Sequence, residues 1–229
     1  MAEFKLARRS RQLELPAPKT WGGARRGAGR PVSERRRPLV PHVARPDHKQ
    51  RYPVHVTFRA QPTIPSLRFA KTFEVVRAAI AASSNGRFRT VAFSVQSDHV
   101  HAIVEADDKR SLSIGVAGLK IRAARALNRA LEREGAVWAG KYHARVLRTP
   151  KEVRATLIYV LQNWKKHVRG ASGIDGRSSG SWFDGWAKAS PSPTTPSPVA
   201  AARTWLASKG WRERGGGPIR IDEIPQRRG

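Results

Sequence analysis

The 229-residue chain carries 44 Lys and Arg residues against 17 Asp and Glu residues, a formal net charge of +27. This imbalance opposes compaction and indicates a polyanionic partner, with nucleic acid the first candidate and an anionic membrane surface the second. The absence of cysteine excludes disulfides, thiolate metal sites and cysteine nucleophiles. Neither an 18-residue apolar run nor a signal-like apolar segment is present, so we expect a cytoplasmic, nucleoid-associated protein without membrane contact.

Residues 1–50 are predicted to form a basic, disordered arm that contacts DNA. They are rich in Arg, Pro and Gly and show no sustained hydrophobic period. Gly29–Pro31 resembles the core of an AT-hook, although Ala28 stands where an arginine usually precedes the glycine. Such an arm contacts the minor groove or, as the simpler alternative, phosphates alone. The candidate DNA contacts are Arg25, Arg26 and Arg30.

Folded sequence is predicted from residue 51 onward. Alternating apolar residues predict strands over 51–60, 88–95, 99–105 and 138–147, the last after a turn. Helical spacing predicts helices over 66–82, 111–134 and 150–167, the last with Thr149 as N-cap and Pro150 in its first turn. This order predicts an α+β fold, the ferredoxin-like βαββαβ arrangement with an antiparallel sheet and both helices on one face, followed by a C-terminal helix.

Beyond Gly170 the regular patterns weaken. Residues 171–229 are rich in Gly, Ser and Pro, with a Pro/Ser linker over 190–198. One short helix is predicted over 200–209, and the final stretch from Gly215 is expected to be mobile. The chain is thus expected to consist of an arm (1–50), a folded domain (51–170) and a tail (171–229).

His99 and His101 are the first candidates for chemistry. Residues two apart on a strand point to the same face, so the two imidazoles lie side by side. Such a pair suits a divalent metal of intermediate softness, or Mg²⁺ or Mn²⁺ where oxygen ligands complete the shell. For a motif this short, solvent-facing or hydrogen-bonded histidines are the commoner explanation.

Tyr159 and Asn163 lie four residues apart on the helix predicted over 150–167. Positions i and i+4 share a helical face, so the phenol and the amide converge with the histidines if that face packs over their strand. The histidines and Asn163 would then hold a metal that polarises a phosphodiester, while the Tyr159 phenolate attacks phosphorus. Each residue taken singly could instead be structural, with Tyr159 in the core and Asn163 at a helix end.

The helix predicted over 111–134 carries a second group of cations. One of its faces is apolar and the other is basic with little acidic relief, which favours contact with a phosphate backbone over a merely solvated face. The candidate DNA contacts on this face are Lys120, Arg122, Arg125 and Arg129.

The run from Ser97 to His101 (SDHVH) and the Tyr159-x-x-x-Asn163 pair together resemble the single-tyrosine HUH transposases, in particular the REP-associated tyrosine transposases, over residues 51–170. The resemblance implies that His99, His101 and Asn163 bind the metal, Mg²⁺ or Mn²⁺, and that Tyr159 is the nucleophile. It also implies a homodimer that cuts and joins single-stranded DNA next to hairpins through a 5′-phosphotyrosine. Trp164 departs from the proline usual in this branch, which bears on the DNA target more than on the chemistry.

Two other functions remain open on the sequence. A domain of this fold could bind hairpin nucleic acid as a regulator without cutting it. A hydrolytic nuclease could instead use water, with His99 or His143 as general base. A trapped covalent adduct would separate these functions from the transposase chemistry. His55 and His143 are expected to be structural.

Overall fold

The computed structural model of the chain describes residues 48–166, 168, 170–188 and 193–225. These residues belong to one compact unit. The expected arm, with Arg25, Arg26 and Arg30, lies outside the described residues except for its last three positions. Of these three, His48 is buried and lies 2.9 Å from the carbonyl oxygen of Ala106 through its Nε2, so the ordered chain begins slightly before the predicted boundary.

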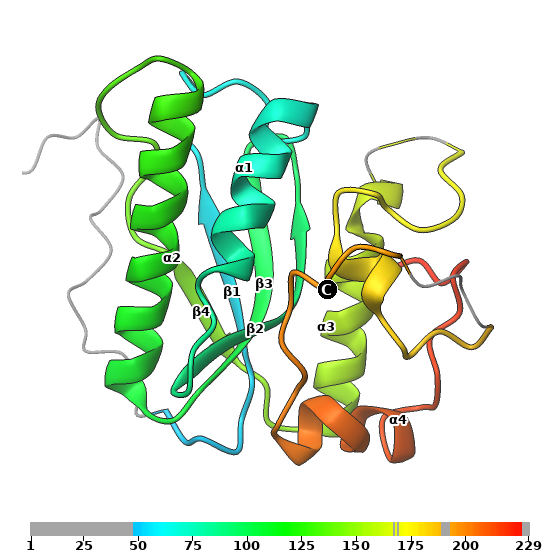
Figure 1. Ribbon diagram of the computed structural model, residues 1–229. Helices are drawn as coiled ribbons and strands as arrows, with labels where there is room; N and C mark the ends of the chain where they lie inside the picture. Colours follow the sequence, from blue (N-terminus) through cyan, green and yellow to red (C-terminus); the bar gives the residue numbers. More distant parts are fainter. Residues whose placement is uncertain (1–47, 167, 169, 189–192, 226–229) are drawn as a thin grey trace, which may run out of the picture. The chain divides into compact units, whose positions relative to one another are not determined.

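Four strands form an antiparallel sheet in the order β2-β3-β1-β4 (Figure 1). The strands are β1 (Val54–Arg59), β2 (Phe88–Val95), β3 (His99–Ala106) and β4 (His143–Val146). β3 and β1 are the two central strands, whereas β2 and the short β4 lie at the edges. The predicted α+β, ferredoxin-like arrangement is confirmed.

Helices cover both faces of this sheet (Figure 1). α1 (Ala70–Ala81) and α2 (Lys109–Ala130) pack side by side on one face, where their apolar residues join those of the strands in the larger core. α3 (Pro150–Gln162) packs on the other face against Ala92 and Ile103. None of the described helices is long and apolar enough to cross a lipid bilayer.

β2 contains a β-bulge at Val91. Thr90 pairs with Val104, whereas Ala92 pairs with Ile103, so β2 has one more residue than its partner at this point. The extra residue shifts the alternation of the strand. Val91 therefore packs against the α3 cluster, whereas Phe93 and Val95 belong to the larger core.

The chain after α3 packs against this helix. It forms helical turns at Ser179–Trp182, Leu206–Gly210 and Trp211–Glu213, and Leu206 and Trp211 join the α3 cluster. Arg154 of α3 donates to the carbonyl oxygens of Gly217 and Pro218 and pairs with Glu223 at 2.8 Å. The segment from Gly215 to Pro225, the last described residue, thus has defined contacts with α3, and its expected mobility stays a prediction.

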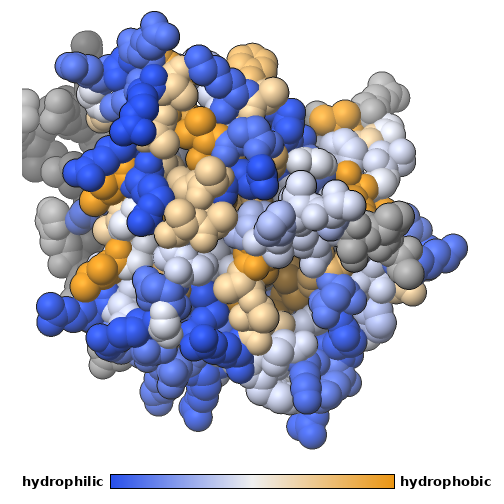
Figure 2. Space-filling model, viewed as in Figure 1, coloured by the Kyte–Doolittle hydropathy of each residue, from blue (hydrophilic) through white to orange (hydrophobic). Residues whose placement is uncertain are grey.

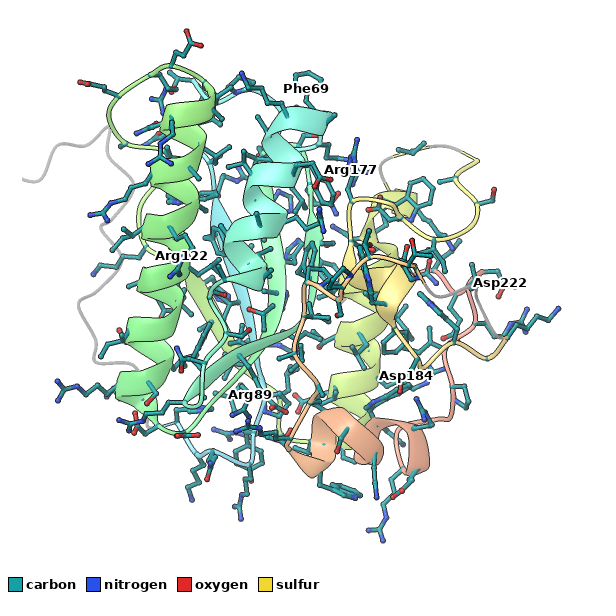
Figure 3. All side chains as sticks on the ribbon, in the orientation of Figure 1. Phe69, Arg89, Arg122, Arg177, Asp184 and Asp222 are labelled. Carbon is teal, nitrogen blue, oxygen red and sulfur yellow. The ribbon has the colours of Figure 1, made fainter. Side chains whose placement is uncertain are left out.

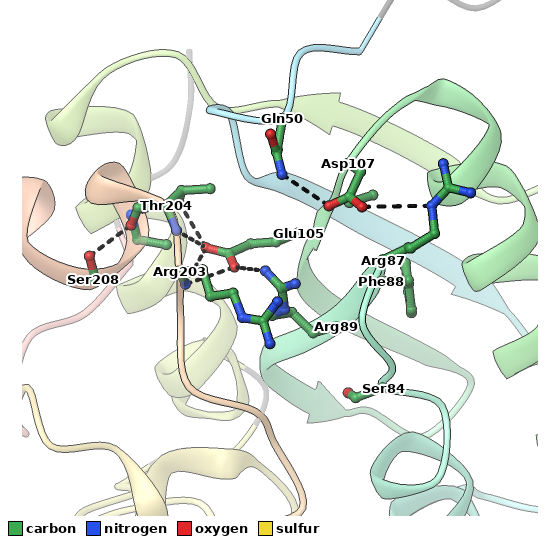
Figure 4. A network of polar contacts seen from close by, with 12 residues as sticks. Gln50, Ser84, Arg87, Phe88, Arg89, Glu105, Asp107, Arg203, Thr204 and Ser208 are labelled. Atoms are coloured by element: carbon green, nitrogen blue, oxygen red, sulfur yellow. Dashed lines mark hydrogen bonds and ion pairs between the residues drawn. The ribbon is translucent and has the colours of Figure 1, made fainter.

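A buried carboxylate joins this C-terminal segment to the sheet (Figure 4). Glu105, on β3, is 1% exposed and pairs with Arg89 at 3.1 Å. It also accepts hydrogen bonds from the backbone nitrogens of Arg203 and Thr204 and from the Thr204 hydroxyl. The charge is thus paired and hydrogen-bonded, as a buried carboxylate must be to be tolerated.

Candidate functional site

The face of the sheet on which α3 packs carries a group of polar side chains from β1 and β3. Thr57 pairs with His101 and Arg59 with His99 in the antiparallel register. Directly paired residues project to the same face, and His55 joins them because it is two residues before Thr57. The predicted side-by-side placement of the two β3 histidines is therefore confirmed.

His99 and His101 direct their Nε2 atoms toward one another. These atoms lie 3.0 Å apart, and the two rings are nearly perpendicular, at 86°. Two adjacent ligands of an octahedral ion such as Mg²⁺, each about 2.1 Å from it, also lie about 3.0 Å apart. The pair fits two neighbouring ligand positions of such an ion.

The other nitrogen of each imidazole is held from outside. His99 Nδ1 lies 2.6 Å from Asp98 Oδ1, and His101 Nδ1 lies 2.9 Å from the Thr57 hydroxyl and 3.2 Å from His55 Nε2. Partial burial opposes ionisation of Asp98, but the hydrogen bond and charge of His99 and the charge of Arg59 outweigh it and lower the pKa of this carboxyl. Outer partners of this kind orient metal-binding imidazoles.

Tyr159 reaches the histidines from α3. This helix starts with a capping box, in which the Thr149 side chain accepts from the Glu152 nitrogen and Glu152 accepts in return, and has Pro150 in its first turn. Nearly three turns later, the Tyr159 hydroxyl lies 3.4 Å from His101 Nε2. The Lys166 ammonium lies 5.3 Å from the Tyr159 ring centroid. The structure thus brings the predicted tyrosine to the predicted histidines.

Asn163 is the C-cap of α3, one turn beyond Tyr159, and is 3% exposed. The spacing places both residues on the same helical face. In the described part of the chain, no group of three or more His, Asp or Glu side chains is arranged to hold a metal ion. A cation at the histidine pair would therefore need oxygen ligands from elsewhere, and the role of Asn163 as one of them stays a prediction.

A cleft of about 960 Å³ opens beside Tyr159. Its walls come from the sheet, from α3 and from the C-terminal segment. The cations among its lining residues outnumber the single carboxylate, Glu223, which is already paired with Arg154. These cations are Arg145, Lys151, Arg154 and Lys166. His55 and His143, expected to be structural, also line the cleft.

The cations predicted on α2 lie on a different side of the domain. α2 covers the sheet face opposite α3, as the position of Arg122 in Figure 3 shows. In Figure 2 the hydrophilic surface is interrupted by apolar patches, and on α2 the exposed Ile114 and Ile121 accompany the cations. The structure does not bring this basic face to Tyr159, and DNA contact stays a prediction for Lys120, Arg122, Arg125 and Arg129.

Four residues of the site were missed at the level of sequence: Thr57, Asp98, Arg145 and Lys166. The pattern around Asp98 indicates only a turn, although this residue directly precedes His99. Thr57 follows His55 at strand spacing, so the two were available as a pair on one face. The proximity of Arg145 and Lys166 to Tyr159 has no local signal, because it depends on how β4 and α3 meet.

Comparison with known proteins finds similarity over the part of the chain that carries this site. Residues 54–163 match the model of the family described as "Transposase IS200 like". One similar solved structure is a REP-associated tyrosine transposase bound to a REP hairpin, with 19% identity, a TM-score of 0.46 and coverage of 56% of this chain and 74% of that one. Another, described as a transposase from Deinococcus radiodurans R1, has 21% identity, a TM-score of 0.35 and coverage of 52% and 92%. No curated protein sequence matches.

The fold and the site define an α+β domain in which a helical tyrosine meets a pair of strand histidines. Residues 54–163, from the first residue of β1 to Asn163, match the IS200-like transposase family. The predicted resemblance to transposases is confirmed by this match.

Proposed function

We propose that the protein nicks and joins single-stranded DNA next to hairpins, with Tyr159 as the nucleophile and His99, His101 and Asn163 as ligands of Mg²⁺ or Mn²⁺. The observation that carries this proposal is the 3.4 Å separation between the Tyr159 hydroxyl and His101 Nε2. It occurs beside a cationic cleft in a domain that matches a transposase family. Hairpins as the target follow from the motif resemblance.

The reaction exchanges one phosphodiester bond for another. The Tyr159 oxygen, after losing its proton to solvent, attacks phosphorus, and the bond to the 3′ oxygen of the preceding nucleotide breaks. That oxygen takes up a proton and leaves as a free 3′-OH, while the 5′-phosphate stays on the tyrosine. Attack by another 3′-OH reverses these steps and joins two strands. A divalent ion at the histidine pair would polarise the phosphodiester.

The surroundings of Tyr159 support this role. The Lys166 ammonium, 5.3 Å from the ring centroid, favours negative charge on the phenol oxygen. Arg145 and Lys151 in the cleft walls would contact phosphates of the bound strand, which is the usual role of such cations. Tyr159 and His101 come from one chain, and the expected homodimer stays a prediction for sedimentation to test.

The proposal is tested with Tyr159→Phe, which removes one oxygen and preserves the ring packing. The full-length protein is incubated with Mn²⁺ and labelled single-stranded hairpins taken from inverted repeats around the gene, then analysed by denaturing gel and peptide mass mapping. We expect a covalent adduct at Tyr159 in the unaltered protein and none in the variant. The matched control, Tyr142→Phe, should form the adduct normally.

The other outcomes identify the competing functions. Cleavage without an adduct would indicate a hydrolytic nuclease, and hairpin binding without cleavage would indicate a regulator. Either result, or an adduct that persists in Tyr159→Phe, would overturn the proposal.

A further inference from the structure

The two histidines of the site differ in what holds their outer nitrogens, and this difference assigns a role to Asp98. We infer that Asp98 is a positioning residue that fixes the tautomer of His99, so that its Nε2 lone pair is presented to a divalent cation. The Thr57 hydroxyl and His55 Nε2, beside His101 Nδ1, by contrast permit either tautomer of His101. This inference rests on the metal site of the proposed function and adds the residue that prepares it.

The contact between Asp98 and His99 is short, with His99 Nδ1 2.6 Å from Asp98 Oδ1. An ionised carboxylate can only accept hydrogen bonds, and bonds to a charged acceptor are the shorter and stronger ones. The proton of a neutral His99 therefore sits on Nδ1. Its Nε2, the atom 3.0 Å from His101 Nε2, is left as a bare acceptor, which is the form that binds metal.

Asp98 is itself held in place from two sides. Its second oxygen, Oδ2, lies 3.4 Å from Arg59 Nε, so each carboxylate oxygen has its own partner. The backbone is fixed as well, because the Ala60 nitrogen donates to the Asp98 carbonyl and the Leu67 nitrogen donates to the Ser97 carbonyl. The carboxylate is therefore positioned before any cation arrives. Because the Asp98 side chain is 53% exposed, its removal should leave the fold intact.

His101 has partners of a different kind. Its Nδ1 lies 2.9 Å from the Thr57 hydroxyl and 3.2 Å from His55 Nε2. A hydroxyl and an imidazole nitrogen can each donate or accept, so neither of these two neighbours forces one tautomer. When Nε2 must be bare, the Nδ1 proton can be donated to Thr57 or to His55. Removal of the Thr57 hydroxyl should therefore be partly compensated by His55, whereas among the described residues no second carboxylate near His99 can replace Asp98.

The inference is tested by the affinity of the full-length protein and its variants for Mn²⁺, measured by calorimetry or electron paramagnetic resonance. Asp98→Ala should weaken binding by about 10- to 100-fold, the range for loss of an outer partner. Asp98→Asn should lose less, because the amide oxygen still accepts from Nδ1. Thr57→Val should also lose less than Asp98→Ala. Unfolding midpoints should stay unchanged in all three variants.

Asp107→Ala provides the matched control for charge. Asp107 follows β3 as Asp98 precedes it, and its carboxylate contacts Gln50 and Arg87 and lies outside the histidine site. The Asp107→Ala substitution removes one negative charge, as Asp98→Ala does, but at the opposite end of β3. Mn²⁺ affinity should be unaffected, which separates the geometric role of Asp98 from a general loss of negative charge.

Long-range ¹⁵N–¹H correlation spectra of the histidine rings provide the readout that a merely structural role would not move. We expect His99 as the Nδ1–H tautomer in the unaltered protein and a shift away from it in Asp98→Ala. An Nε2–H tautomer in the unaltered protein, or unchanged Mn²⁺ affinity in Asp98→Ala, would overturn this inference alone. Failure of the unaltered protein to bind Mn²⁺ would overturn the metal site and the inference with it. The outcome of the Tyr159 adduct experiment does not depend on the tautomer of His99, so it tests the proposed function separately from this inference.

Discussion

The two faces of the sheet are formed by alternate residues of the same strands but have different roles. On β3, Val100, Ala102 and Val104 are buried against α1 and α2, whereas His99 and His101 point to the opposite face. Each fully buried valine side chain contributes about 1.5–3 kcal/mol. The α1/α2 face can therefore stabilise the strands in one register, while the α3 face combines a second apolar cluster with polar groups that stabilise little.

Packing on the α1/α2 face explains how polar atoms from distant parts of the chain are held within hydrogen-bond distance on the other face. Thr57 and His101 are 44 residues apart in sequence, but the β1–β3 register places the hydroxyl and Nδ1 at 2.9 Å. That register is set by the apolar face, since a slip by one residue would move every side chain to the wrong side. The precision of the site thus depends on packing on the far side of the sheet.

The largest expected effect is on the apolar face. Phe93→Ala removes a fully buried ring from the core that the sheet forms with α1 and α2. It should lower the free energy of unfolding by about 3–5 kcal/mol, measured by urea denaturation. Tyr159→Phe, on the other face, should cost at most about 1.5 kcal/mol. Equal losses for the two variants would contradict the division of roles between the faces.

The second prediction concerns the histidine pair. His99→Ala and His101→Ala should each reduce DNA cleavage by more than about 100-fold, beyond the loss for an outer partner, while hairpin binding persists because cations elsewhere contact the phosphates. Excess chelator should stop the unaltered enzyme in the same way. The matched control is His143→Ala, an exposed histidine on the cleft wall, which should retain most of the activity. Full cleavage in excess chelator would remove the metal site from the mechanism.

The sequence predicts the strands, the helices and the meeting of Tyr159 with the two histidines better than it predicts their surroundings. Alternation and helical spacing are local patterns, so the six core elements and the tyrosine–histidine motifs could be found from the chain alone. The bulge at Val91 could not, because one extra residue in a strand leaves the composition unchanged. The packing of most of the C-terminal segment was not predicted, because its Gly, Ser and Pro content indicates a linker. Four of the seven tryptophans lie beyond residue 170, and two of them, Trp186 and Trp211, are buried.

The two groups of cations give the smallest and most discriminating prediction. Helical spacing in the sequence predicts the exposed, basic face of α2. Which side of the sheet α2 covers depends on the topology and cannot be predicted in this way. The cleft cations come from separate elements and were not found. If single-stranded DNA enters the cleft to reach Tyr159, the cleft cations and not those of α2 should contact the unpaired nucleotides beside the cleavage point.

Lys151→Ala combined with Lys166→Ala should therefore reduce the salt dependence of binding to a short unpaired oligonucleotide. The slope of log K against log salt should fall by about 0.7 for each phosphate that the variant no longer neutralises. The matched pair, Arg122→Ala with Arg129→Ala, removes the same charge from α2 and should leave that slope unchanged. Fluorescence anisotropy over a series of salt concentrations measures both, in the Tyr159→Phe background so that no adduct forms. An equal fall in slope for the two pairs would contradict this prediction. It would show that the bound strand also contacts α2, which lies on the opposite face of the sheet and can be reached only by a strand that wraps around the domain.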